Sequence, residues 1–378
     1  MKALYRTFAA LVMLTGAVPP ALPSTRQDAM ALEQQGNIAE AEQAWLALAS
    51  ADPRNAEALA HLGLLEARQQ RFEPAIAYYR QAAALNAELP GLQMNLGLAL
   101  YKTGDFKGAL KPFTAELLKN PGDQRLTILL GMTHYGMGDY LLAVPYLQRA
   151  AERDPQNLPL RLTLAHSCLW AKQIPCVLET YKQILALNAE SAEADMLAGE
   201  ALDESGDNAG AVVQFRAAVK ANPQEPNVHF GLGYLLWRQS QFDEAAKEFQ
   251  AELENDATED QARIYLADCY VELNDYAKAG AELEKVAPVS ESTAMVHRDL
   301  GIVYASAGRN EEAAAELRKA IALDPKDVSP HWRLAKLYQA MGRKDEAKAE
   351  FATASAMNKE SSQALYDKIA NAQTRNAR

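Results

Sequence analysis

Residues 56–89 read AEALAHLGLLEARQQRFEPAIAYYRQAAALNAEL, and the pattern of this 34-residue unit recurs without an insertion from about Leu22 to Ser361. Ten copies result, and we number the positions of each copy from 1 to 34. Position 8 is always Gly or Ala, position 20 is Ala in every copy except the fifth, and position 24 is always large and apolar. A period of this kind indicates one structural unit that is stacked many times.

Each copy predicts two short helices joined by a turn. Apolar residues at positions 4, 7, 8 and 11, and again at 17, 20, 24 and 27, place one apolar stripe on each helix. Small residues at positions 8 and 20 let the two backbones approach closely, and the large residue at position 24 fills the remaining space. Gly followed by Asp at positions 15 and 16 predicts the end of the first helix and the cap of the second, at Gly104–Asp105, Gly138–Asp139 and Gly206–Asp207. Pro at position 32 predicts the end of the second helix in five copies, at Pro53, Pro121, Pro155, Pro223 and Pro325.

A 34-residue helix–turn–helix unit with this pattern resembles the tetratricopeptide repeat. The resemblance covers residues 22–361, about nine-tenths of the chain. It implies an all-α fold, a right-handed α-solenoid of about ten repeats with a concave groove. Repeats of this kind must stack, because a single helix pair leaves one apolar face uncovered. Residues 362–378 predict a terminal capping helix with a polar tail.

The first 21 residues predict a signal peptide that is removed. Lys2 and Arg6 give a basic start, residues 8–18 form a largely apolar run, and Pro19 and Pro20 follow it. A run of this length is too short to span a bilayer. We therefore expect an exported protein of the bacterial type, periplasmic or secreted, with no membrane insertion after the signal is removed. The alternative is a frayed hydrophobic N-terminus on a cytosolic protein.

The composition argues against nucleic acid and anionic membrane surfaces as partners, since 38 Lys and Arg stand against 49 Asp and Glu. No phosphate-binding glycine loop, HExxH motif or nucleophile elbow is present in the sequence. We therefore expect no enzymatic activity, no cofactor and no metal site. His229, His297 and His331 share position 4, where helix packing is the expected role.

Two cysteines suggest a disulfide in the irregular fifth repeat. Cys168 and Cys176 stand at positions 11 and 19, which face each other when two helices turn back between them. We hypothesise a Cys168–Cys176 disulfide formed in an oxidising compartment. The alternative is a pair of small buried side chains. Cys269, at position 10, is expected to replace a core Ala.

In the family that the chain resembles, positions 2, 5, 9, 12 and 13 of the first helix line the concave face. Many of these positions carry aromatic, Met or aliphatic residues that helix pairing does not require, which is typical of a partner site. The candidate binding residues are Met94, Leu98, Tyr101, Ile128, Met132, Tyr135, His166, Trp170, Phe230, Tyr234, Trp237 and Arg238. Glu200, Asp203 and Glu204 form an acidic cluster in the sixth repeat, where we expect a basic residue of the partner. The alternative is an inner face that packs against itself.

Position 27, where Ala is usual, is Glu116 in the third repeat and Glu252 in the seventh. Burial of a carboxylate is unfavourable unless the group is paired. We expect the long stems to carry both carboxylates to solvent.

These patterns predict a non-enzymatic scaffold that binds a protein partner, as a peptide or a helix, in its concave groove. By analogy with the family, the protein could instead be a subunit of an envelope assembly or polysaccharide-export machine. A third interpretation is a glycan-binding accessory protein that uses Trp170, Tyr234 and Trp237 as aromatic platforms.

Overall fold

The computed structural model describes residues 25–188, 190–286 and 293–376. Within these ranges the chain forms helices and no strand, which confirms the all-α expectation. The predicted signal peptide, residues 1–21, lies outside the described residues. None of the described helices is both long enough and apolar enough to cross a membrane.

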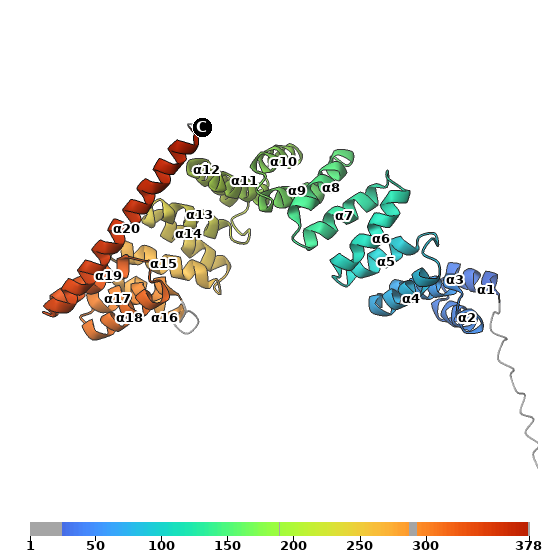
Figure 1. Ribbon diagram of the computed structural model, residues 1–378, viewed down its shortest axis with the longest axis horizontal. Helices are drawn as coiled ribbons and strands as arrows, with labels where there is room; N and C mark the ends of the chain where they lie inside the picture. Colours follow the sequence, from blue (N-terminus) through green and yellow to red (C-terminus); the bar gives the residue numbers. More distant parts are fainter. Residues whose placement is uncertain (1–24, 189, 287–292, 377–378) are drawn as a thin grey trace, which may run out of the picture. The chain divides into compact units, whose positions relative to one another are not determined.

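The helices divide between two compact units, residues 1–167 and 168–378, which meet within one helix, α9 (Leu158–Trp170). The first unit contains α1 (Arg26–Gln34), α2 (Ile38–Ala51), α3 (Ala56–Arg68), α4 (Phe72–Leu85), α5 (Leu92–Lys102), α6 (Phe106–Lys119), α7 (Gln124–Gly136) and α8 (Tyr140–Arg153). Odd-numbered helices are the first helices of the repeats, and even-numbered helices are the second (Figure 1).

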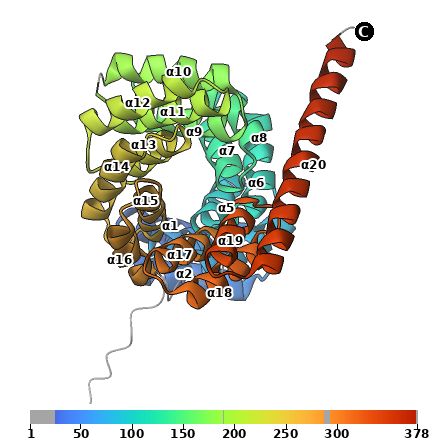
Figure 2. The ribbon, with the colours of Figure 1, turned by 90° about the vertical axis from the view of Figure 1, so that its left-hand side faces the viewer.

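The second unit continues the same alternation of first and second helices. It contains α10 (Ile174–Leu187), α11 (Ala192–Glu204), α12 (Asn208–Ala221), α13 (Val228–Arg238), α14 (Phe242–Asn255), α15 (Asp260–Glu272), α16 (Tyr276–Val286), α17 (Ala294–Ser306), α18 (Asn310–Leu323), α19 (Ser329–Ala340) and α20 (Lys344–Asn376). The first helices α11, α13 and α15 lie side by side, with α12, α14 and α16 behind them (Figure 2).

The two helices of a repeat are held together by the contact between positions 8 and 24. The rings of Tyr79 and Phe113 are buried against the backbones of Gly63 and Gly97. A Cβ added to Gly97 would lie only 2.6 Å from a ring carbon of Phe113. Because real Cβ atoms need more space, the close approach of the helices depends on the absence of a side chain here.

The predicted turns form, but Gly is not essential to them. Gly104, Gly138 and Gly206 have φ between +76° and +87°, and Asp105 and Asp207 cap the next helix by accepting the amides of Gly108 and Gly210. Asp139 makes no such capping bond. In other copies Gln70, Lys172, Ser240 and Asn274 adopt a similar positive φ. Tertiary packing therefore imposes the turn even where the residue disfavours it.

The predicted proline stops are also confirmed, with one exception at the end of the chain. Helices α2, α6, α8, α12 and α18 each end two residues before the proline of position 32. The last second helix, α20, instead passes through Lys359 and continues to Asn376. Residues 362–376 therefore extend α20 and do not form a separate capping helix. No Gly or Pro interrupts residues 344–376, and Ala, Lys, Glu and Gln favour helix.

A ladder of polar pairs joins the two helices of the last four repeats. Position 4 is His229, Arg263, His297 or His331, and each contacts the Glu at position 23 of its own repeat. The contacts are His229 Nδ1 to Glu248 (2.6 Å), Arg263 to Glu282 (2.8 Å), His297 Nδ1 to Glu316 (2.6 Å) and His331 Nδ1 to Glu350 (2.6 Å). The expected packing role of the histidines is confirmed, and each histidine also has a polar partner that the sequence patterns missed.

We predict that Gly97→Ala destabilises the first unit by about 1–3 kcal/mol, because the new methyl group overlaps Phe113. Urea unfolding followed by circular dichroism measures the change. Gly122→Ala is the matched control, since a Cβ there meets no atom within 4 Å and its φ is not positive. Equal unfolding midpoints for the two variants would contradict this packing argument.

We predict that Glu316→Gln destabilises the second unit at pH 7 by about 1–3 kcal/mol. Burial acts to raise the pKa of Glu316, but hydrogen bonds from Lys319 and His297 outweigh it and hold the pKa below its ordinary value. The charged form therefore contributes stability at neutral pH, and this contribution is lost as pH falls through the lowered pKa. The difference between wild type and variant should shrink below about pH 4. A pH-independent difference, or an equal effect of the exposed control Glu284→Gln, would contradict the prediction.

Candidate functional site

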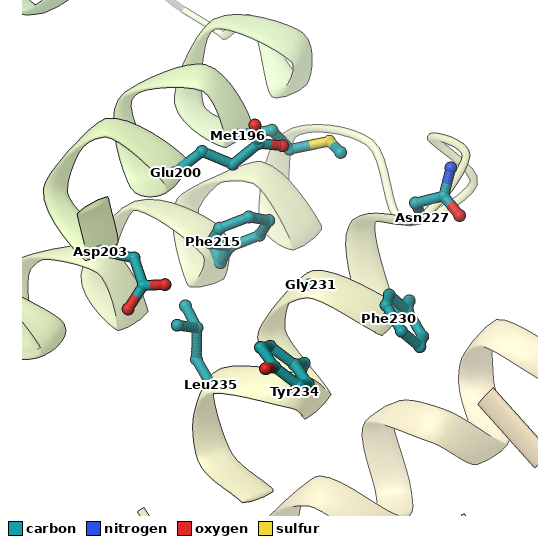
Figure 3. Close-up of a pocket in the computed structure, with 9 residues that line it drawn as sticks. All are labelled: Met196, Glu200, Asp203, Phe215, Asn227, Phe230, Gly231, Tyr234 and Leu235. Carbon is teal, nitrogen blue, oxygen red and sulfur yellow. The ribbon is translucent and has the colours of Figure 1, made fainter. Parts of the chain in front are cut away.

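A pocket of about 260 Å³ lies between α11 and α13 in the second unit (Figure 3). We call it the α11–α13 pocket. Its lining is mostly apolar, with acidic and amide groups among the remainder, and consists of Met196, Glu200, Asp203, Phe215, Asn227, Phe230, Gly231, Tyr234 and Leu235. Small-molecule and side-chain sites have this character, an apolar cavity with a few polar groups.

Helical spacing brings the predicted residues of this pocket together. Glu200 and Asp203 stand at positions 9 and 12 of the sixth repeat, and Phe230 and Tyr234 stand at positions 5 and 9 of the seventh. Residues three or four apart share one face of a helix. The structure therefore gathers four of the candidate residues in one cavity, between two adjacent first helices.

Sequence reasoning missed Phe215 and Gly231, which also line the pocket. Phe215 occupies position 24 and was assigned to packing alone. A Cβ on Gly231 would lie 2.2 Å from the Phe215 ring, so this glycine lets α13 pack closely against the ring beside the cavity. The sequence does single out Gly231, because the seventh repeat is the only copy with Gly at position 6.

The start of α13 is held by Glu252, and the expectation that this carboxylate reaches solvent is wrong. Glu252 is 3% exposed, and its two oxygens accept the backbone amides of Asn227 (3.1 Å) and Phe230 (3.0 Å). The first amides of a helix have no partner within it and attract negative charge. Glu116 is half-buried and bonds to Asn120.

Four aromatic side chains that pack against one another form one wall beside the pocket, which we call the aromatic wall: Phe230, Tyr234, Trp237 and Tyr265. The Tyr234 ring lies 5.9 Å from Trp237 and 5.4 Å from Tyr265, between ring centroids. The guanidinium of Arg238 lies 5.8 Å from the centre of the Tyr234 ring. These contacts fix the ring orientations and leave the wall rigid.

Ion pairs within the chain partly neutralise the acidic cluster, and its expected contact with a basic residue of a partner stays a prediction. Arg238 bonds to both carboxylate oxygens of Asp203, at 2.6 and 2.7 Å. Lys172 lies 3.5 Å from Glu204. The first pair joins α13 to α11, and the second joins the turn between α9 and α10 to α11, relations that the sequence alone does not display.

Trp237 is not an open platform, because its indole nitrogen donates to Asp268 at 2.5 Å. Asp268 is 2% exposed and also bonds to Arg298, which pairs in turn with Asp299 at 2.8 Å. Burial raises the pKa of Asp299 to about 7 against the opposing charge of Arg298. One Asp299 oxygen has no hydrogen-bond partner in the described part of the chain.

The remaining candidate residues do not line the α11–α13 pocket. Six lie on α5 and α7 of the first unit, where they are half-buried: Met94, Leu98, Tyr101, Ile128, Met132 and Tyr135. His166 is half-buried on α9, and Trp170, at the end of that helix, is 48% exposed. Among the described residues, no group of three or more His, Cys, Asp or Glu could hold a metal ion.

In the structure Cys168 of α9 and Cys176 of α10 are joined as a disulfide, with their Cα atoms 5.8 Å apart. This separation lies in the usual range for disulfides. The third cysteine, Cys269, is buried. Burial, together with the charge of Asp268, raises the pKa of its thiol to about 12, so the thiol should be unreactive in the folded state.

Stacked helix pairs of this kind define an α-solenoid repeat protein. Family models described as tetratricopeptide repeat match residues 27–91, 94–157, 178–226, 201–260 and 230–292. Further models of the repeat match residues 134–200, 301–342 and 328–361. The matches extend over more than half of the chain, and the chain belongs to the tetratricopeptide repeat family. Members of this family are generally non-catalytic interaction scaffolds.

Curated relatives share only part of their length with this chain. Intraflagellar transport protein 70A of Danio rerio is 26% identical over 212 residues, which are 55% of this chain and 31% of that protein. Peroxisome biogenesis protein 5 of Arabidopsis thaliana is 30% identical over 157 residues, which are 42% of this chain and 21% of that protein. The chain therefore spans less than a third of either relative.

Some solved structures are similar to part of this chain at low identity. The crystal structure of MamA is 21% identical with a TM-score of 0.38, and the match covers 44% of this chain and 96% of that chain. The structure of YrrB, described as a TPR protein with an unusual peptide-binding site, is 16% identical with a TM-score of 0.41. The match covers 50% of this chain and 97% of that chain. These likenesses concern the fold alone.

We predict one free thiol per molecule when the protein is denatured without reductant, and three after reduction. Alkylation followed by intact-protein mass spectrometry counts them. Closing this short loop should stabilise the fifth repeat by about 2–3 kcal/mol, so the unfolding midpoint should fall on reduction. Three free thiols before reduction would rule out the disulfide.

Proposed function

We propose that this protein is a non-enzymatic scaffold that binds a peptide or helical segment of a protein partner at the α11–α13 pocket. The observation that carries the proposal is the apolar cavity itself, floored by Phe215 and bounded by the aromatic wall. A cavity of this kind suits an apolar anchor residue of a partner, since anchors in desolvated pockets supply most of the binding free energy.

Membership of the tetratricopeptide repeat family supports a role in protein–protein interaction. It does not identify the partner, and a subunit of an envelope assembly or polysaccharide-export machine is one form such a scaffold could take. The glycan-binding interpretation loses support, because Trp237 is engaged with Asp268 and packed against Tyr265. A sugar platform needs an aromatic face that is open to the ligand.

We further propose that the protein is exported to the periplasm or beyond. The basic start and the apolar run of residues 8–18 support this. A disulfide between Cys168 and Cys176 would agree with an oxidising compartment. The intact mass of the protein recovered from the periplasm of an expression host tests the proposal, since export should remove about 21 residues. A full-length mass would oppose it.

We predict that Met196→Arg weakens peptide binding by about tenfold or more, because it places a charge in the apolar pocket. Selection from a displayed library of random 12-residue peptides supplies the ligands, and fluorescence anisotropy measures their Kd. The matched control is Val213→Arg on α12, where the native side chain is 61% exposed and lies outside the pocket.

The proposal stands if selected peptides bind wild type and Val213→Arg but not Met196→Arg, with unchanged helical content in both variants. It fails if the library yields no peptide that binds the protein. It also fails if Met196→Arg binds the selected peptides as tightly as the control does.

A further inference from the structure

A second cavity repeats the architecture of the α11–α13 pocket three repeats further along the second unit. It has a volume of about 280 Å³ and lies between α17 and α19, and we call it the α17–α19 pocket. Leu317 takes the place of Phe215 at position 24 of the floor. Positions 9 and 12 of one repeat and positions 6, 9 and 10 of the next line both cavities.

The charged residues of the two cavities have opposite signs. Glu200 and Asp203 line the α11–α13 pocket, and its lining includes no Lys or Arg. Arg238 pairs with Asp203 from outside the lining, as Glu272 does with Arg333 at the other pocket. Arg333 and Lys336 line the α17–α19 pocket, and its lining includes no Asp or Glu. Two equivalent apolar cavities on one unit therefore differ mainly in the sign of the charge beside them.

We propose that the two pockets bind one extended peptide segment of bipolar charge. An apolar residue next to a basic residue would enter the α11–α13 pocket, and an apolar residue next to an acidic residue would enter the α17–α19 pocket. This inference rests on the proposed peptide-binding function and adds the chemistry and spacing of the ligand. Complementary charge at both ends fixes the register of the segment and excludes segments with the wrong charge.

Lys336, the exposed cation of the α17–α19 pocket, is available to such a ligand. Arg333 lies 3.4 Å from Glu272, within the chain. Lys336 is exposed and forms no ion pair with any described residue. The net charge of the whole chain is −11, so attraction of an acidic residue to this end must come from local cations and not from the overall field.

The surface between the pockets is built as a rigid spacer. Trp237 of α13 bonds to Asp268 of α15, and Asp268 bonds to Arg298 of α17. Because these groups satisfy one another, they hold three successive first helices at a fixed separation. A fixed separation lowers the ordering required when a ligand binds both pockets at once.

The spacing of the helices sets the length of the ligand. Packed helices lie about 8–10 Å apart, so the three steps from α13 to α19 amount to about 24–30 Å. An extended chain rises about 3.3–3.6 Å per residue. The two apolar residues of the ligand should therefore be about seven to nine residues apart.

Synthetic peptides with blocked ends test the inference. The reference peptide is Lys-Leu, a linker of seven Ser and Gly residues, then Leu-Glu. Companion peptides carry Lys at both ends, Glu at both ends, or the reference charges with a linker of three residues. We expect wild type to bind the reference peptide about fivefold to tenfold more tightly than each companion, as measured by fluorescence anisotropy.

Reversing the charge of one pocket residue gives the decisive test. Lys336→Glu should reverse the preference, so that the peptide with Lys at both ends binds more tightly than the reference peptide. Lys348→Glu, on the second helix of the same repeat and outside the pocket, is the matched control and should leave the preference unchanged.

The outcomes separate this inference from the proposed function. Equal binding of all charge patterns, or an unchanged preference in Lys336→Glu, overturns the bipolar ligand. If library peptides still bind and still depend on Met196, the peptide-binding function survives that result. If no synthetic peptide binds, the bipolar ligand is overturned as well, and the library selection alone decides the proposed function.

Discussion

The close contact between a small residue at position 8 and a large residue at position 24 is the constraint on which every other feature of this protein depends. Gly97 has no room for a methyl group beside Phe113, and the same relation holds between Gly199 and Phe215. Such contacts bring the first and second helices of a repeat together at the density of a protein interior. Once the helices are this close, the turn between them must be tight, and residues as unsuited to a positive φ as Gln70 and Lys172 adopt it.

Close packing also determines where charge can be buried. Polar groups between the helices are tolerated because they meet partners there, as His297 does with Glu316 and Glu252 does with the free amides of α13. In the eighth and ninth repeats the same requirement gathers Asp268, Arg298 and Asp299 around Trp237. The contacts from Trp237 to Asp268 and from Asp268 to Arg298 tie successive repeats to one another, as does the apolar core cluster that extends over several repeats.

The pockets lie on the face of the first helices, where the contact between positions 8 and 24 leaves space. In the seventh repeat the glycine at position 6 lets α13 lie directly against Phe215, a buried ring that also lines the cavity. In the tenth repeat Arg333 and Lys336 bring positive charge to the equivalent place. A repeated scaffold can thus offer chemically different cavities by varying a few positions that do not pair helices. This separation of packing residues from surface residues explains why membership of the family defines the fold of this chain without defining its partner.

The repeat period, the helix pairs, most helix ends and the core positions followed from the sequence, because each depends on residues within one 34-residue unit. Four residues of the α11–α13 pocket were also predicted, since helical spacing alone puts them on one face. The partners of Asp203, Trp237 and Glu252 could not be predicted in this way. Each lies 22 to 35 residues away in the chain, and it comes within reach only through the angle and distance at which helices pack. The uninterrupted course of α20 is a further case: the period predicts a break near Lys359, but the helix continues to Asn376. Local chemistry therefore determined the repeating unit, and tertiary packing decided which charges are paired and where cavities open.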